Sequence, residues 1–170
     1  MKSKKNIVFL GMMGSGKSSI GLMVSKKLDL EFIDIDNEIE KKTGMKIAKI
    51  FEKRGEKFFR EIEEDLTLKI LNNKKTVISL GGGAFLNKKI KKEVLENHLS
   101  FWLNWDTSTL INRIKGSKKR PLALKLSKNE LIQLIKARSV IYSKSQFKIN
   151  CENLSKIEIV NIILKIYETN

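Results

Sequence analysis

The strongest constraint on this chain is a phosphate-binding loop near its N-terminus. Residues 11–18 read GMMGSGKS and match the pattern G-x-x-x-x-G-K-[ST] at every position. The apolar run 7–10 precedes the loop, and a helical pattern over 19–28 follows it. When a strand, a glycine-rich loop and a helix follow one another in this way, backbone N–H groups of the loop point inward at a bound phosphate. The N-terminus of the helix adds partial positive charge at the same place. The motif predicts a nucleoside triphosphate site, with Lys17 on the β- and γ-phosphates and the Ser18 hydroxyl on Mg²⁺.

The composition is typical of one globular domain. The chain has 170 residues, of which 41% are hydrophobic and 31% charged, so it can bury a self-sufficient core. No apolar run approaches the ~18 residues of a transmembrane helix, and the basic start leads into an expected strand without a secretory signal. The single cysteine, Cys151, excludes an internal disulfide and, with only one histidine, argues against a zinc site. We expect a cytoplasmic protein that does not contact a membrane.

The formal net charge of +15 raises the question of nucleic-acid binding. Nucleic-acid interfaces cluster their basic residues and interleave them with aromatic ones. Here the lysines are spread along the chain, and the longest basic stretches, 88–92 and 115–120, are short. We therefore expect no nucleic-acid partner, and a solvated basic surface that attracts anionic substrates more strongly at low salt.

Short apolar runs alternate with helical patterns along the whole chain. The expected strands cover residues 7–10, 32–34, 76–80, 100–103 and 147–150. The expected helices cover residues 17–29, 36–43, 46–53, 56–72, 88–96, 107–115, 128–144 and 155–167. Strands that alternate with helices form β-α-β units and a parallel sheet covered on both faces. The predicted fold class is α/β, a single three-layer α/β/α domain over residues 1–170 with a five-stranded parallel sheet.

Two acidic residues lie at the end of the second expected strand. Ligands of a parallel sheet bind at the carboxyl ends of its strands, and residues two apart on a strand point the same way. Asp34 and Asp36 would then leave this strand together beside the phosphate loop, where one carboxylate with Ser18 is enough to hold Mg²⁺. The alternative is that Asp36 only caps a helix starting at Asn37, and the sequence leaves both open.

Three consecutive glycines, Gly81–Gly83, follow the third expected strand. Such a run is costly to order. It indicates a backbone that approaches a ligand closely or adopts positive φ, and the alternative is a flexible turn. Arg60 lies on the helix expected over 56–72 and, taken alone, would be an ordinary surface arginine.

Taken together, these features resemble the shikimate kinases. The resemblance runs from Ile7 to about Leu164. It rests on the phosphate loop, Asp34 and Asp36, Gly55-Glu56 followed by Phe59-Arg60-Glu61-Ile62-Glu63, Gly81–Gly83, Arg120-Pro121-Leu122, and Arg138 with Tyr142. Many unrelated proteins share a phosphate loop, but this combination in this order is specific. The family implies a P-loop kinase fold with a mobile lid, and transfer of the γ-phosphoryl group of ATP to the 3-hydroxyl of shikimate in aromatic amino-acid biosynthesis.

The resemblance implies a role for each matching position. The nucleotide would be bound by Gly14, Ser15, Gly16, Lys17, Ser18, Ser19, Arg113 and Arg120, and Mg²⁺ by Ser18 and Asp34. Shikimate would be bound by Asp36, Arg60, Gly81, Gly82, Gly83 and Arg138, with Phe51 and Phe59 as apolar walls. The expected catalytic residues are Lys17, Asp36 as the base, and Arg120 on a lid near residues 114–126. The substrate-binding helices would cover about residues 34–62.

The residue types suit this chemistry. Planar arginines such as Arg60 and Arg138 bind a carboxylate bidentately, which lysine cannot do. Phosphoryl transfer depends on positioning and charge neutralisation more than on covalent chemistry. The chain departs from the family pattern at Ser19, where threonine is common, and over residues 138–142 (RSVIY), which lack the proline of R-x-P-x-Y. The helix carrying Arg138 therefore need not bend there.

Three other functions are compatible with a phosphate loop. A gluconate kinase would also bind a carboxylate and hydroxyls, but the Arg60 helix, the three glycines and Arg138 favour shikimate. A nucleic-acid-binding P-loop ATPase would use the positive charge. An inactive relative would lack one of the motif residues, but all of them are present in this sequence. We further expect a monomer with Trp102 and Trp105 in packing roles, His98 on the surface and Cys151 buried.

Overall fold

The structure, a computed structural model, describes residues 5–116 and 126–170. Over these ranges, one parallel sheet is formed by β1 (Ile7–Leu10), β2 (Glu31–Asp34), β3 (Thr76–Ser79), β4 (Leu99–Asn104) and β5 (Phe147–Asn150). The α-helices described are α1 (Lys17–Leu28), α2 (Ile35–Thr43), α3 (Ile47–Leu71), α4 (Lys88–Asn97), α5 (Thr107–Lys115), α7 (Lys128–Tyr142) and α8 (Lys156–Glu168). A short 3₁₀ helix, η1 (Ala84–Leu86), was not expected from the sequence. The predicted five-stranded parallel sheet is confirmed.

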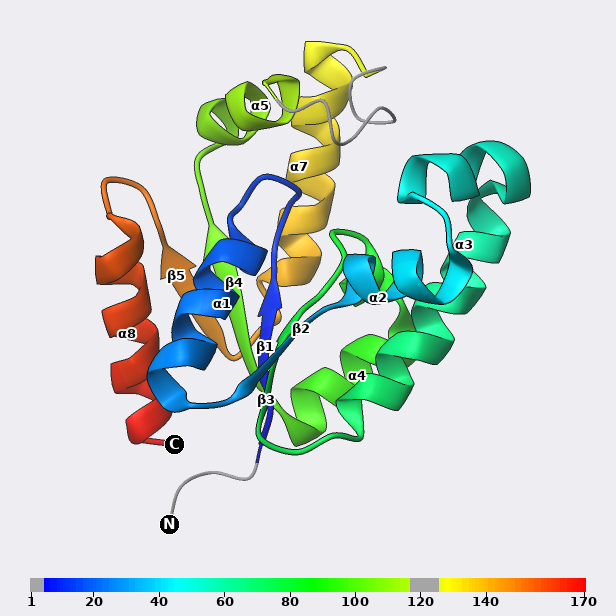
Figure 1. Ribbon diagram of the computed structural model, residues 1–170. Helices are drawn as coiled ribbons and strands as arrows, with labels where there is room; N and C mark the ends of the chain where they lie inside the picture. Colours follow the sequence, from blue (N-terminus) through cyan, green and yellow to red (C-terminus); the bar gives the residue numbers. More distant parts are fainter. Residues whose placement is uncertain (1–4, 117–125) are drawn as a thin grey trace.

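Helices cover both faces of this sheet, as expected (Figure 1). Successive residues of a strand point to opposite faces, and the central strand β1 shows this directly. Val8 and Leu10 pack in a core with α3, α4 and α7. Ile7 and Phe9 pack in a second core with α1 and α8. Because both faces of β1 are covered, the strand is a continuous apolar run without alternation.

The strand order β2-β3-β1-β4-β5 decides which loops meet. Strand β1 pairs with β3, and β3 pairs with β2, all in parallel. Beyond the last paired residues, the N–H of Leu80 still donates to the carbonyl oxygen of Phe9 at 3.0 Å. The phosphate loop after β1, the glycines after β3 and the acidic residues after β2 therefore emerge at neighbouring positions on one edge of the sheet.

The substrate-side helix α3 is bent at one residue. Gly55 has φ 79° and ψ 171° inside the span Ile47–Leu71, a conformation that is open essentially to glycine alone. In a straight helix, residues eight apart are separated by about 12 Å along the axis. The bend instead brings the rings of Phe51 and Phe59 to a centroid distance of 4.6 Å. The helices expected over 46–53 and 56–72 are the two arms of α3.

The surface position expected for His98 is wrong. The residue is 6% exposed, and its Nε2 lies 3.4 Å from Glu93 Oε1. It ends α4 and leads directly into buried Leu99 of β4 without a loop between them, so the side chain is enclosed where helix meets sheet. Burial lowers the pKa of His98. The packing role of Trp102, which is buried, and the buried position of Cys151 are confirmed.

Over the described residues, no helix has both the length and the apolar composition that crossing a bilayer would require.

Candidate active site

The phosphate loop is shaped by glycines with positive φ. Gly11, Gly14 and Gly16 have φ values of 142°, 79° and 90°, which side-chain-bearing residues rarely adopt. Lys17 begins α1 and is 6% exposed. Its Nζ donates to the carbonyl oxygens of Gly11 at 2.8 Å and Met12 at 3.0 Å. The ammonium group is therefore held inside the concavity that the loop encloses.

Two residues from the β4–α5 region hold this loop from outside. Trp105 Nε1 donates to the carbonyl oxygen of Ser15 at 2.9 Å, and Arg113 Nη1 donates to that of Gly14 at 3.3 Å. The Arg113 guanidinium lies 3.9 Å from the centroid of the Trp105 ring, a cation–π contact. Arg113, expected near the nucleotide, thus borders the loop. Trp105 packs as expected, but its hydrogen bond to the loop was not foreseen.

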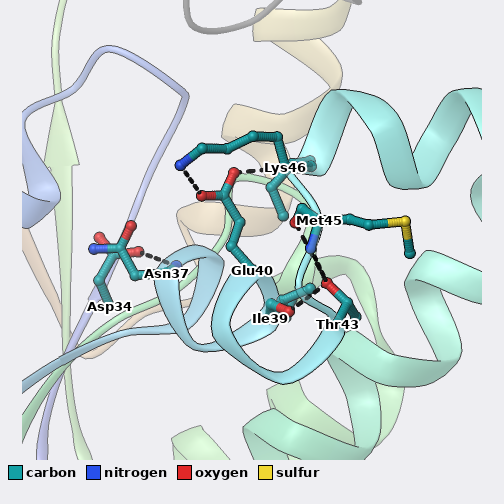
Figure 2. Close-up of polar contacts among 8 residues, drawn as sticks. Asp34, Asn37, Ile39, Glu40, Thr43, Met45 and Lys46 are labelled. Atoms are coloured by element: carbon teal, nitrogen blue, oxygen red, sulfur yellow. Dashed lines mark hydrogen bonds and ion pairs between the residues drawn. The ribbon is translucent and has the colours of Figure 1, made fainter.

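The two aspartates have different positions. Asp34 ends β2 and caps α2: its Oδ1 accepts from the N–H of Asn37 at 3.2 Å (Figure 2), and its Oδ2 accepts from the Ser18 hydroxyl. Asp36 lies in the first turn of α2. The expectation that both leave one strand is therefore wrong, because β2 ends at Asp34. The alternative that Asp36 only caps the helix is also wrong, since Asp34 is the cap.

The corner between α2 and α3 is closed by polar contacts. Glu40 accepts from Lys46 Nζ at 2.7 Å and from the N–H of Ile47 at 3.0 Å (Figure 2). Ile47 is the first residue of α3, so Glu40 satisfies one of the N–H groups that a helix start leaves unpaired. Thr43 Oγ1 accepts from the N–H of Met45 at 3.3 Å. These contacts fix the direction in which the first arm of α3 leaves α2.

A pocket of about 260 Å³ lies at this edge of the sheet. It is lined by Gly14, Gly16, Lys17, Ser18, Ser19, Asp34, Asp36, Ser79 and Leu80. The lining combines one ammonium group, hydroxyls and two carboxylates. Ser18 Oγ and Asp34 Oδ2 are in direct contact. These are the hard oxygen donors that Mg²⁺ prefers, and Mg²⁺ commonly completes its shell with waters, so this donor pair fits the ion.

The three glycines after β3 lie against charged side chains. In this described segment none of them has positive φ, so that reason for the run is excluded. A Cβ built on Gly81 would lie 2.9 Å from Asp36 Oδ1, and one on Gly83 only 2.5 Å from Arg60 Nη1. One on Gly82 would lie 3.5 Å from Arg138 Nη1. Gly81 and Gly83 are needed because a side chain there would occupy the space of Asp36 or Arg60, whereas a Cβ on Gly82 would make only ordinary contacts.

Arg60 is held by two acidic residues of its own helix. Its Nη1 lies 2.6 Å from Glu63 Oε2, and its Nη2 lies 3.3 Å from Glu56 Oε1. The Glu63 side chain is only 3% exposed. Burial raises the pKa of Glu63, and the charge of Asp36 acts in the same direction, against Arg60 and Arg138. Glu63 was not foreseen as a site residue, although its i,i+3 spacing from Arg60 indicated a shared helix face.

Arg138 extends from α7 toward the glycine loop after β3. Its side chain is half-buried, with Nη1 3.9 Å from Met12 Sδ. Its Nε is buried and has no hydrogen-bond partner among the described residues. A buried guanidinium N–H without a partner is costly, and a ligand carboxylate would satisfy it. The missing proline does not displace Arg138, since α7 continues to Tyr142.

The structure therefore brings together sequence-predicted residues from five segments of the chain: Lys17 and Ser18, Asp34 and Asp36, Arg60, Gly81–Gly83, and Arg138. Arg120 and most of the lid expected over 114–126 lie outside the described residues.

A phosphate loop after β1, beside an acidic helix start and a second loop lined by arginines, defines a P-loop kinase that acts on a small anionic molecule. A family model described as shikimate kinase matches residues 13–168. The chain belongs to the shikimate kinase family, ATP-dependent phosphotransferases that act on an alcohol group in aromatic amino-acid biosynthesis.

Individual relatives agree with the family match. The chain is 42% identical over 170 residues to the shikimate kinase of Bacillus subtilis, covering 95% of this chain and 88% of the relative. It is 39% identical over 160 residues to that of Persephonella marina, covering 94% and 97%. The structure of a shikimate kinase from Acinetobacter baumannii in complex with shikimate superposes with a TM-score of 0.92 at 30% identity, covering 99% and 96%. A gluconokinase from Sinorhizobium meliloti, at 16% identity and a TM-score of 0.62, shares the fold alone.

Proposed function

We propose that this chain phosphorylates the 3-hydroxyl of shikimate with ATP, using the residues assembled at the carboxyl edge of its sheet. One observation carries this proposal. Consecutive glycines place their backbone against the guanidinium groups of Arg138 and Arg60, and the Nε of Arg138 is buried without a partner in the described part of the chain. Two arginines of this kind suit the carboxylate of a small acid.

On the nucleotide side, charge neutralisation supplies most of the catalysis. The loop N–H groups and Lys17, which sits within the loop, would bind the β- and γ-phosphates. Ser18 and Asp34 would hold Mg²⁺, and the ion would neutralise charge that develops on the phosphates. Because Ser18 and Asp34 already contact each other, binding the ion requires only small movements of their oxygens.

On the substrate side, Asp36 faces the hydroxyls. It lines the pocket together with Lys17, so a hydroxyl bound by Asp36 lies near the phosphate-binding ammonium group. Asp36 would orient the 3-hydroxyl and accept its proton as the γ-phosphoryl group is transferred. Phe59 would form an apolar wall, because its buried ring packs at a tilt against that of Phe51 and lies 5.1 Å from the Arg60 guanidinium.

The remaining expectations stay proposals. Arg120, on a lid near residues 114–126, would close over the phosphates and exclude water. The enzyme would act as a monomer in the cytoplasm without a nucleic-acid partner, as its dispersed charge and single buried thiol suggest. Size-exclusion chromatography, and ADP release measured with and without added RNA, test these points.

A coupled assay of ADP release tests the function itself. We expect release that requires both shikimate and Mg²⁺, with no release above background when gluconate replaces shikimate. Chelation of Mg²⁺ with EDTA should abolish the reaction, and excess Mg²⁺ should restore it. Equal release with gluconate, or none with shikimate, would contradict the proposal.

A further inference from the structure

The hydroxyl of Tyr142 contacts the loop that would bind the substrate. Tyr142 is the last residue of α7, and it is 1% exposed. Its hydroxyl donates to the carbonyl oxygen of Gly82, which is 60 residues distant in sequence. The ring of Trp102 lies behind it at a centroid distance of 6.1 Å. A buried side chain from one element thus holds a single peptide group of another.

The contact with Tyr142 also sets the direction of the N–H group in the Gly82–Gly83 peptide. The chain contains no cis peptide bond in its described part, so the carbonyl of Gly82 and the N–H of Gly83 share one plane and point in opposite directions. Holding the carbonyl on Tyr142 therefore turns the N–H of Gly83 away from α7. No hydrogen bond from this N–H to a residue within 5–116 or 126–170 is observed, so it can serve a ligand oxygen.

The same helix carries Arg138, one turn before Tyr142. Residues four apart share a helix face, and both side chains lie 3.9 Å from Met12 Sδ in the phosphate loop. One face of α7 thus contacts both loops: Arg138 and Tyr142 contact Met12 in the phosphate loop, and Tyr142 also contacts the carbonyl of Gly82. This face fixes the two loops and Arg138 relative to one another.

We propose that the Tyr142 hydroxyl is a positioning group for shikimate binding: it sets the orientation of the Gly82–Gly83 peptide so that the Gly83 N–H donates to the bound acid. This inference rests on the proposed function. It assigns Tyr142 no contact with the substrate, so its effect must be transmitted through the glycine loop.

The test compares two tyrosine-to-phenylalanine changes. The chain has two tyrosines, and Tyr167 lies on α8 in the other core, 7% exposed. We expect Tyr142→Phe to raise the KM and Kd for shikimate roughly three- to tenfold, the range for one lost hydrogen bond. The KM for ATP and the Kd for ADP should stay within about twofold. Tyr167→Phe, the matched control, should change none of these constants.

Each outcome separates the inference from the proposed function. A purely structural role for the hydroxyl would lower the melting temperature and leave the shikimate constants unchanged, or raise the shikimate and nucleotide constants alike; either result overturns the inference. If the parent protein does not phosphorylate shikimate, the proposed function fails first. If parent and Tyr167→Phe are active and Tyr142→Phe matches them, only the inference fails.

A second measurement covers the case in which Tyr142→Phe does not fold. Both tyrosines of the parent can be replaced biosynthetically by 3-fluorotyrosine, and the two fluorine resonances assigned with Tyr167→Phe. We expect the Tyr142 resonance to shift on saturation with shikimate while that of Tyr167 stays in place. A Tyr142 resonance that does not respond to shikimate overturns the inference.

Discussion

The two glycine-rich loops at the edge of the sheet use glycine for different reasons. In the phosphate loop, Gly11, Gly14 and Gly16 have positive φ, and the backbone itself is the binding surface. In the second loop, none of Gly81–Gly83 has positive φ, and the space that a side chain on Gly81 or Gly83 would occupy is filled by Asp36, Glu63 or Arg60. The first loop needs glycine for its own shape, and the second needs it because of its neighbours.

This difference has a consequence for substitution. A side chain in the phosphate loop distorts the backbone, so that folding and nucleotide binding suffer together. A side chain on Gly81 or Gly83 meets the ends of other side chains, which can move aside without unfolding the protein. Changes there should therefore affect shikimate binding while stability is kept.

The largest effect is expected at Lys17, the charge inside the phosphate loop. Lys17→Ala removes the ammonium group that neutralises developing phosphate charge, and we expect kcat to fall about 10²- to 10³-fold, as for other electrostatic stabilisers. Lys26→Ala, on the exposed face of the same helix, is the control and should retain parental activity. A loss of less than about tenfold in kcat, or ~1.4 kcal/mol, would remove Lys17 from the catalytic residues.

The next largest effect is expected at Asp36. Asp36→Asn keeps the size of the side chain but cannot take a proton, and a largely dissociative transition state asks little of a base, so we expect a loss of about 10²-fold in kcat. The helix should remain capped because Asp34 supplies the cap, so the melting temperature should not change. Asp34→Asn is the matched variant: it can still cap, and it should instead raise the Mg²⁺ concentration needed for half-maximal rate. A kcat for Asp36→Asn within about threefold of the parent would leave Asp36 as a binding residue only.

The phosphate loop and the second glycine loop also differ in how well the sequence predicts them. The phosphate loop was recognisable because its requirements are local and its spacing is fixed by its own backbone. The three glycines also stand out in the sequence, but the sequence leaves open whether they allow a close approach to a ligand, a positive φ or a flexible turn. That reason depends on Asp36, which comes from α2, and on Arg60, which comes from α3, so it is a property of the tertiary structure.

Other differences have the same origin. The strands and helices were predicted to within a few residues, because their signals are periodic. The sequence places Asp36 at the end of a strand because it does not show that α2 begins at Ile35. Glu63 received no role, although it is the buried partner of Arg60. His98 was placed on the surface because nothing in the sequence shows that α4 leads into β4 without a loop.

A pair of glycine substitutions tests the contrast directly. Gly83 has φ −104°, which alanine can adopt, but its methyl group would displace the end of Arg60. We expect Gly83→Ala to raise the shikimate KM about tenfold, near 1.4 kcal/mol, as for a weakened charge-assisted contact. Its melting temperature should stay close to that of the parent.

The matched change in the first loop is Gly11→Ala. Its φ is 142°, and a Cβ would lie 3.0 Å from the carbonyl oxygen of Leu103 and from Ser15 Oγ. Such strain costs roughly 1–3 kcal/mol of stability, and the nucleotide constants should rise as well. If Gly83→Ala lowers the melting temperature as much as Gly11→Ala, the proposed difference between the two loops is wrong.

The smallest effect is expected at Glu63, where pH provides a second variable. Glu63→Gln keeps the shape of the side chain and removes the negative partner of Arg60, which lies 2.6 Å away. With this partner neutral, Arg60 is less firmly oriented, and we expect the shikimate KM to rise about threefold at pH 7.5, within the range for one charge-assisted hydrogen bond. The KM for ATP should not change.

The pH dependence follows from the direction of the pKa shift. Burial raises the pKa of Glu63 above 4.5, the usual value for glutamate. As pH falls through the raised value, Glu63 takes up a proton and shikimate binding by the parent should weaken, at a pH where an ordinary glutamate would still be charged. Stability should move the other way: the folded state binds this proton more readily than the unfolded state does, so this group destabilises the protein above its folded pKa, and that penalty is relieved as pH falls toward 4.5.

In Glu63→Gln both dependences should disappear from this pH window. The shikimate KM should no longer rise as pH falls toward 4.5, except for the titration of shikimate itself, which parent and variant share. The difference in melting temperature between parent and variant should likewise change with pH only between 4.5 and the raised pKa of Glu63 in the parent. Measuring KM and melting temperature for both proteins from pH 7.5 down to pH 4.5 checks the two signs together. If the shikimate KM rises in the same way at low pH in parent and variant, Glu63 does not act through Arg60. Shikimate binding at the second loop would then depend on the arginines without Glu63.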